Sequence, residues 1–150
     1  MKALVQRVAE ASVEVGGSRV AEIGTGLLVL LGITHNDKRA DAERLARKLA
    51  ALRIFEDGQG MMNLAVTDVG GSVLLVSQFT LYADTRKGNR PSFVAAARPE
   101  QAEPLYESLL AELRILLGED KVCNGIFGSE MKVRLLNDGP VTVELCTDAK

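Results

Sequence analysis

The chain contains a continuous apolar run, Gly26-Leu27-Leu28-Val29-Leu30-Leu31-Gly32-Ile33. A half-exposed strand alternates apolar and polar residues, whereas a strand buried on both faces has an unbroken apolar sequence. The run is also far too short to cross a bilayer as a helix. We therefore expect a central strand of a β-sheet here, covered on both of its faces.

Two further strands are predicted before this run. Residues 3–15 place apolar side chains mostly at odd positions, which is the period of a half-buried strand. The turn signal Gly16-Gly17-Ser18 follows, and residues 19–23 form the returning strand. Arg7 interrupts the apolar phase, so it is either an edge residue or a donor held in place by a partner.

Two helices are indicated by apolar residues at helical spacing. The first begins after Asn36 or Asp37, either of which can cap it, and its leucines recur at Leu45 and Leu49. The second spans roughly residues 103–117 and ends at Gly118. The apolar stripe of this second helix consists of Leu105, Leu109, Leu113 and Leu116.

Strand patterns also cover residues 72–81, 121–124, 131–136 and 141–147. The last two flank Asp138-Gly139-Pro140, which is expected to be the turn of a hairpin. Hairpins at both ends of the chain predict an α+β fold, in which a mainly antiparallel or mixed, barrel-like sheet carries two helices. The sequence contains no linker or repeat, so residues 1–150 are expected to form a single domain.

The composition is that of an ordinary globular protein, with 47% hydrophobic and 25% charged residues. Aromatic residues make up only 4% and there is no Trp, so the core must be aliphatic. Charged and polar residues interrupt the first segment, which is unlike a signal peptide. We therefore expect a cytoplasmic protein with no membrane association.

Metal and disulfide chemistry are not expected. Cys123 and Cys146 are the only cysteines, and their apolar strand-like surroundings favour buried free thiols. His35 is the only histidine, whereas zinc sites usually take several Cys or His ligands. The sequence thus predicts no metal and no cofactor.

The chain carries a small net negative charge but contains one locally basic loop. The formal net charge is −2, which argues against a dedicated nucleic-acid coat protein. The loop Asp84-Thr85-Arg86-Lys87-Gly88-Asn89-Arg90-Pro91 nevertheless crowds three cations together. Such a cluster is more often a solvated surface loop than a phosphate site. However, the irregular stretch from residue 82 to residue 99 is long enough to suggest a functional loop.

Familiar catalytic motifs are absent, including the nucleophile elbow, the dinucleotide fingerprint and a Ser-His-Asp set. An enzyme with this sequence must use hydroxyls, backbone amides and groups of its substrate. The segment Ser77-Gln78-Phe79-Thr80-Leu81 meets that requirement, because N–H groups at a strand end can hold an oxyanion. On these residues alone, however, the polar phase of a half-exposed strand is the favoured interpretation.

Two other places are open to two interpretations. A peptide bond before proline adopts the cis form at modest cost, so Gly139-Pro140 can fix unusual carbonyl directions or simply form a turn. Phe127 and Met131 can line an apolar pocket or belong to the core.

The chain resembles the D-aminoacyl-tRNA deacylase family of bacterial type, which hydrolyses the ester between a D-amino acid and tRNA. The most specific matching stretches are Val76-Ser77-Gln78-Phe79-Thr80-Leu81, Arg90-Pro91-Ser92-Phe93 and Asn137-Asp138-Gly139-Pro140-Val141-Thr142. Others include Ala3-Leu4-Val5-Gln6-Arg7-Val8, Gly26 to Gly32, Arg53-Ile54-Phe55, Met62-Asn63-Leu64 and Gly70-Gly71-Ser72-Val73. Several such motifs in the correct order cover almost the whole chain.

The resemblance implies a homodimer in which a cis Gly139-Pro140 motif reaches into the pocket of the other subunit. Its carbonyls would exclude the side chain of an L-amino acid and tolerate a D-amino acid. Glycine has no side chain to exclude, so mischarged glycyl-tRNA is a further expected substrate. Arg7 would brace the Gly-Pro turn.

The resemblance also assigns roles to the remaining site residues. Ser77, Gln78, Phe79 and Thr80 would form the other wall, with the Phe79 and Thr80 amides on the scissile carbonyl. Phe127 and Met131 would shape the space for the terminal adenosine, and Arg86 and Lys87 would contact the tRNA acceptor end, with a salt-sensitive affinity. Asn124 stands where the family commonly has Thr, which puts the fine shape of the adenosine end in doubt.

Alternatives remain for mechanism and for function. Thr80 could be a nucleophile, or the 2′-hydroxyl of the terminal ribose could activate water. We favour the second, because the sequence supplies no base for Thr80. The rival functions are a non-catalytic module that binds tRNA or another nucleic acid, and a hydrolase acting on another D-aminoacyl ester or amide.

Overall fold

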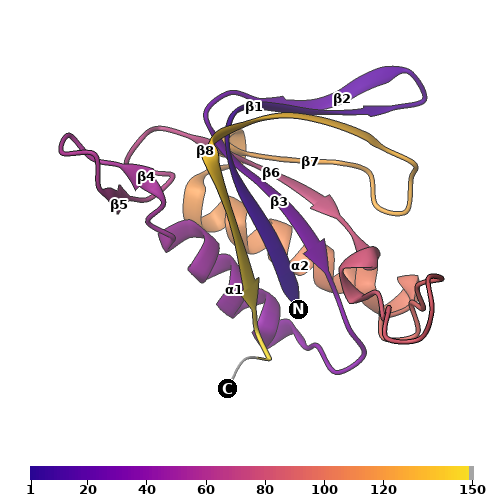
Figure 1. Ribbon diagram of the computed structural model, residues 1–150. Helices are drawn as coiled ribbons and strands as arrows, with labels where there is room; N and C mark the ends of the chain where they lie inside the picture. The colour runs from indigo at the N-terminus through magenta and orange to yellow at the C-terminus, as the bar shows by residue number, and fades with distance from the viewer. Residues whose placement is uncertain (149–150) are drawn as a thin grey trace.

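A computed structural model of the chain describes residues 1–148 (Figure 1). Its strands are β1 (Lys2–Val15), β2 (Ser18–Ile23), β3 (Gly26–Gly32), β4 (Phe55–Glu56), β5 (Met62–Leu64), β6 (Ser72–Ser77), β7 (Val122–Asn124) and β8 (Lys132–Cys146). Its helices are α1 (Arg39–Ala51) and α2 (Pro99–Leu117), with short 3-10 helices η1 (Phe79–Tyr82) and η2 (Glu119–Lys121).

The main sheet is built around β1. The strand order is β2-β1-β3-β6-β7, and β8 also pairs with β1. β1 runs antiparallel to β2, β3 and β8, whereas the β3–β6 and β6–β7 pairs are parallel. Strands β4 and β5 form a separate two-stranded sheet. The predicted α+β fold with a mixed sheet and two helices is confirmed.

Both faces of the central strand β3 are buried, as its apolar run predicted. Leu27, Val29 and Leu31 join the core that the sheet shares with the two helices. Leu28 belongs to a second cluster on the opposite face, together with residues of β1 and β6. Helices α1 and α2 pack against each other on one side of the sheet (Figure 1). Because β3 is buried on both faces, the residues at its carboxyl end are held in a fixed position.

The prediction of a hairpin turn at Asp138-Gly139-Pro140 is wrong. β8 continues through these residues, and both of its halves pair with β1 in the same direction. Gln6 is in register with Thr142 and Val8 with Asn137, so four residues of β8 lie opposite Arg7 alone. The segment is therefore a large bulge within one strand. The residues expected to form a turn are the extra residues of this bulge.

The helix ends also differ from those predicted. Lys38 is the N-cap residue of α1, because the carboxylate of Asp37 is engaged elsewhere, accepting from the Thr34 amide and the Met1 ammonium. Helix α2 begins at Pro99, which suits the first helical position. Leu116 is 40% exposed, because the buried face of α2 passes through Tyr106 and Leu110.

Both cysteines are free but only half-buried. Cys123 lies in β7 at one edge of the sheet, and Cys146 ends β8, so neighbouring structure covers each of them incompletely. Among residues 1–148, neither helix is long and apolar enough to traverse a lipid bilayer.

Candidate functional site

A cavity of about 570 Å³ lies at the carboxyl ends of β3 and β6, beside the first turn of α2. Five residues singled out in the sequence line it together, although they come from two distant segments. These residues are Ser77, Gln78, Phe79, Phe127 and Met131. The cavity is mostly apolar, with its polar groups concentrated where β6 ends, which is the usual character of a small-molecule site.

The polar end of the cavity is a short turn, residues 78–82, which we call the amide turn. The Gln78 N–H donates to the Leu31 carbonyl of β3 at 2.7 Å, and η1 begins directly afterwards. The first N–H groups of a helix have no partner within it. Within residues 1–148, the N–H groups of Phe79 and Thr80 donate to no acceptor. Two adjacent amides are thus free to bind an oxygen atom.

The side chains of the amide turn add no general base. The Gln78 side-chain amide donates to the Thr80 hydroxyl oxygen at 2.6 Å, which occupies an acceptor site of that oxygen without removing its proton. Phe79 is 57% exposed and packs edge-on against Phe93, with ring centroids 5.1 Å apart. The turn therefore offers hydrogen-bond donors beside an aromatic wall.

The Gly139–Pro140 peptide bond is cis, and Gly139 has a φ of 138°. The Arg7 Nε donates to the Asp138 carbonyl at 2.9 Å, and the Arg7 Nη1 donates to the Ile54 carbonyl at 2.8 Å. Arg7 is only 6% exposed. Of the two interpretations of Arg7, the structure supports the second: Arg7 is a donor held by its partners, and it connects the bulge to the segment between α1 and β4.

Within one chain the bulge does not meet the cavity. Ser77 is in register with Leu31, and Leu31 with Ala3, whereas the bulge lies opposite Arg7 on the other side of β1. This offset corresponds to about 13 Å along the strands and about 14 Å across them. Arg7, Gly139 and Pro140 are therefore separated from the five residues that line the cavity.

The predicted basic loop lies next to the amide turn and is closed by a bridge between Asp84 and Ser92. Arg86 forms a bidentate pair with Asp84, at 2.9 and 2.7 Å, which holds the pKa of this carboxyl at about 2. Lys87 and Arg90 are exposed on the same loop. One of the two cations assigned to tRNA thus already has a carboxylate partner.

Asn124 is not among the residues that line the cavity. Its side-chain oxygen accepts from the Arg114 guanidinium of α2 at 3.0 Å, and its amide donates to the Gly125 carbonyl at 2.8 Å. The presence of Asn instead of Thr at position 124 therefore affects the contact between β7 and α2. A side chain at Gly125 would lie 2.6 Å from the Met131 sulfur, so this glycine gives the cavity wall its room.

Sequence reasoning missed part of the cavity wall. Phe93, Ala96, Ala97 and Pro99 line it from the segment that enters α2. The stretch Arg90-Pro91-Ser92-Phe93 was the available signal, but no periodicity showed that Phe93 would turn inward. The segment is held by the Ala97 N–H donating to the Ile33 carbonyl at 2.9 Å.

Comparisons with known proteins agree with one another. The family model described as D-Tyr-tRNA(Tyr) deacylase matches residues 4–146. A D-aminoacyl-tRNA deacylase of Chloroflexus aurantiacus is 58% identical over 95% of this chain and 88% of that protein. Its counterpart in Chloroherpeton thalassium is 55% identical over 100% of this chain and 98% of that protein.

Solved structures show the same fold. A protein described as c-Myc DNA Unwinding Element Binding Protein has a TM-score of 0.94 and 46% identity, covering 99% of this chain and 100% of its own. One described as a probable eukaryotic D-amino acid tRNA deacylase has a TM-score of 0.83 over 96% of this chain and 97% of its own. Its 17% identity carries only the likeness of fold.

Proposed function

The chain belongs to the D-Tyr-tRNA(Tyr) deacylase family, and we propose that it hydrolyses the ester bond between a D-amino acid and tRNA. The products are the free amino acid and the tRNA. One observation carries this proposal beyond family membership: among residues 1–148 no acceptor is bound by the N–H of Phe79, which lines the apolar cavity, or by that of the adjacent Thr80. That arrangement suits an ester whose carbonyl oxygen gains negative charge during hydrolysis.

The reaction needs little from side chains. The carbonyl oxygen of the ester binds the two free amides, and water attacks the carbonyl carbon. The bond from this carbon to the ribose oxygen then breaks, and the ribose oxygen takes a proton. The adjacent 2′-hydroxyl of the terminal ribose orients and activates the water, because Thr80 has no base beside it. Phe127 and Met131 accommodate the terminal adenosine in the apolar part of the cavity.

Selection for D-amino acids requires a second copy of the chain. Gly139 and Pro140 lie far from the amide turn of their own chain, so a homodimer would bring the partner subunit's Gly139 and Pro140 to each cavity. Backbone carbonyls there would collide with the side chain of an L-amino acid and leave space for a D-amino acid. Glycine has no side chain, so mischarged glycyl-tRNA would also be hydrolysed.

The tRNA itself would be held by its phosphates. Lys87 is the freer cation on the loop beside the amide turn, and Arg86 would contribute if its pair with Asp84 opened. Binding through such a patch weakens as salt increases. A tRNA substrate also favours a cytoplasmic location, as the sequence suggested.

A non-catalytic nucleic-acid-binding function is the second candidate. It is favoured by the description of the structure that is 46% identical to this chain, which names DNA binding. The formal net charge of −2 opposes a general affinity for DNA. The free amides have no role in that function, whereas ester hydrolysis uses them directly.

The deciding experiment compares three substrates: D-Tyr-tRNA, L-Tyr-tRNA and a free D-tyrosine ester. We expect release of tyrosine from D-Tyr-tRNA only. Equal hydrolysis of the L form would reject selection by the Gly-Pro motif, and hydrolysis of the free ester alone would favour a general D-ester hydrolase. Binding of all tRNAs without turnover would leave the non-catalytic function.

Replacing Thr80 with alanine is expected to keep kcat/KM for D-Tyr-tRNA within about tenfold of wild type, since no general-base step passes through Thr80. The variant retains the Thr80 backbone N–H, so the proposed oxyanion contact is unchanged. Thr80→Val is the matched control, because it keeps the shape of the side chain and removes only the hydroxyl group. Near-complete loss of activity in a correctly folded Thr80→Ala protein would establish Thr80 as the nucleophile.

A further inference from the structure

We propose that Lys2 is a positioning residue that holds the amide turn in its active geometry. The Lys2 ammonium is 3.5 Å from the Leu81 carbonyl oxygen and 4.8 Å from the centre of the Tyr82 ring. Both contacts fall on the last two residues of η1. A cation near the final carbonyls of a helical turn is favourable, and its approach to an aromatic ring adds a cation–π attraction.

The amide turn is fastened at each of its ends. Its beginning is tied to the sheet by the hydrogen bond from Gln78 to Leu31. Its end is held by Lys2, through Leu81 and Tyr82. The two free amides lie between these attachments, so their directions depend on both.

The surface beneath the turn is shaped to receive it. Gly32 of β3 is in register with Lys2 of β1, so both residues present the same face of the sheet to the turn. A side chain at Gly32 would lie 3.0 Å from the Leu81 Cβ, 3.1 Å from the Tyr82 ring and 3.2 Å from the Gln78 carbonyl oxygen. The missing side chain thus lets the turn sit directly on β3, within reach of Lys2.

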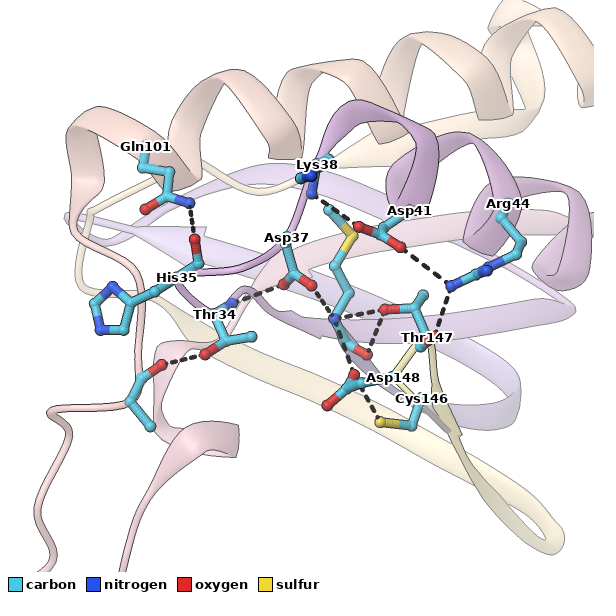
Figure 2. A network of polar contacts seen from close by, with 12 residues as sticks. Thr34, His35, Asp37, Lys38, Asp41, Arg44, Gln101, Cys146, Thr147 and Asp148 are labelled. Atoms are coloured by element: carbon cyan, nitrogen blue, oxygen red, sulfur yellow. Dashed lines mark hydrogen bonds and ion pairs between the residues drawn. The ribbon is translucent and has the colours of Figure 1, made fainter. Parts of the chain in front are cut away.

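The backbone of Lys2 is held in place, because Met1 before it is anchored. The Met1 side chain is fully buried, and its ammonium donates to Asp37 at 2.6 Å and to Thr147 at 2.7 Å. The Thr147 N–H returns a hydrogen bond to the Met1 carbonyl at 3.0 Å. Figure 2 shows Asp37 and Thr147 converging on this point from the loop before α1 and the end of β8.

This inference rests on the proposed use of the Phe79 and Thr80 amides in catalysis. Lys2 itself neither lines the cavity nor belongs to the basic loop, so a change at Lys2 removes no proposed substrate contact and KM is expected to stay near its wild-type value. The amides, however, lose the contacts that Lys2 makes at the end of the turn. We therefore expect a lower kcat with a nearly unchanged KM. A general loss of structure would change both constants, so the two explanations can be told apart.

The test compares Lys2→Met with Lys2→Arg and wild type on D-Tyr-tRNA. Lys2→Met keeps the length of the side chain and removes the charge, and its kcat is expected to fall about tenfold with KM within about twofold. Lys2→Arg restores the cation and is expected to recover most of the loss. Amide hydrogen exchange at Leu81 and Ala83, whose N–H groups close the turn, is expected to become about tenfold faster in Lys2→Met.

Lys121 offers a matched control, because its ammonium also donates to a backbone carbonyl, that of Gly70 at 3.1 Å, in a loop outside the cavity. Lys121→Met is expected to match wild type in kcat and in exchange at the amide turn. An unchanged kcat or unchanged exchange in Lys2→Met would overturn the inference. A wild-type protein without deacylase activity would reject the proposed function instead, while the exchange rates would still report whether Lys2 holds the turn.

Discussion

Replacing Phe79 with proline is expected to lower kcat for D-Tyr-tRNA by about 10²–10³-fold, the usual effect of removing one oxyanion donor. Proline removes the N–H of Phe79 and leaves that of Thr80. The substitution is placed where proline disturbs a helical turn least, because Phe79 is the first residue of η1 and Gln78 before it lies outside the helical region. The loss would therefore come from the missing donor and not from a broken turn.

The matched control is Phe79→Ala, which removes the same ring and keeps the N–H. We expect its kcat to stay within about tenfold of wild type, because the ring's packing on Phe93 and its part of the cavity wall are lost while both amides remain. Steady-state kinetics and a thermal melt of both variants make the comparison. If proline and alanine reduce kcat equally, the ring is the important group and the amide is not an oxyanion donor.

Gly139→Ala is expected to lower deacylation by about 10²-fold, because a shift of about 1 Å in positioning groups has effects of that size. The φ of 138° at Gly139 strains any L side chain. The new Cβ would also lie 2.7 Å from the Val141 Cγ2 and 2.9 Å from the Arg7 Nη2. The bulge must therefore move, and its carbonyls move with it.

Stability should change much less than activity in this variant. We expect the free energy of unfolding to fall by about 2 kcal/mol, as for other strained backbone positions. Gly16→Ala is the control, because Gly16 also has a positive φ, of 58°, but no atom lies within 4 Å of a Cβ there. Deacylation by Gly16→Ala should match wild type. Wild-type discrimination between D- and L-Tyr-tRNA in Gly139→Ala would contradict a screening role for the bulge.

The sequence predicted the fold where one pattern has one structural meaning. The apolar run at residues 26–33 is consistent with a strand covered on both faces, as β3 is, and the alternation over residues 3–15 matches β1. It failed at Asp138-Gly139-Pro140, because the same turn residues serve a hairpin and a bulge. Only the register shows that both flanking segments pair with β1.

The candidate site was predictable only in part, for a similar reason. Residues 77–80 stood out because small polar residues end an apolar strand, and Phe127 and Met131 because the motifs resemble a known family. The free amides could not be predicted, because the acceptors of backbone N–H groups depend on the tertiary structure and not on the local sequence. The contacts of Lys2 were also hidden, because they join it to residues 79 and 80 positions further along the chain.

The bulge and the amide turn lie in separate places on one protomer, so in the proposed homodimer each site would be a joint product of two chains. A chain defective only in its amide turn could still lend a sound bulge, and a chain defective only in its bulge could still lend sound amides. Mixed pairs of such chains would then hold one intact centre and one doubly defective centre. Damage to this protein would be shared between subunits and, in some combinations, complemented.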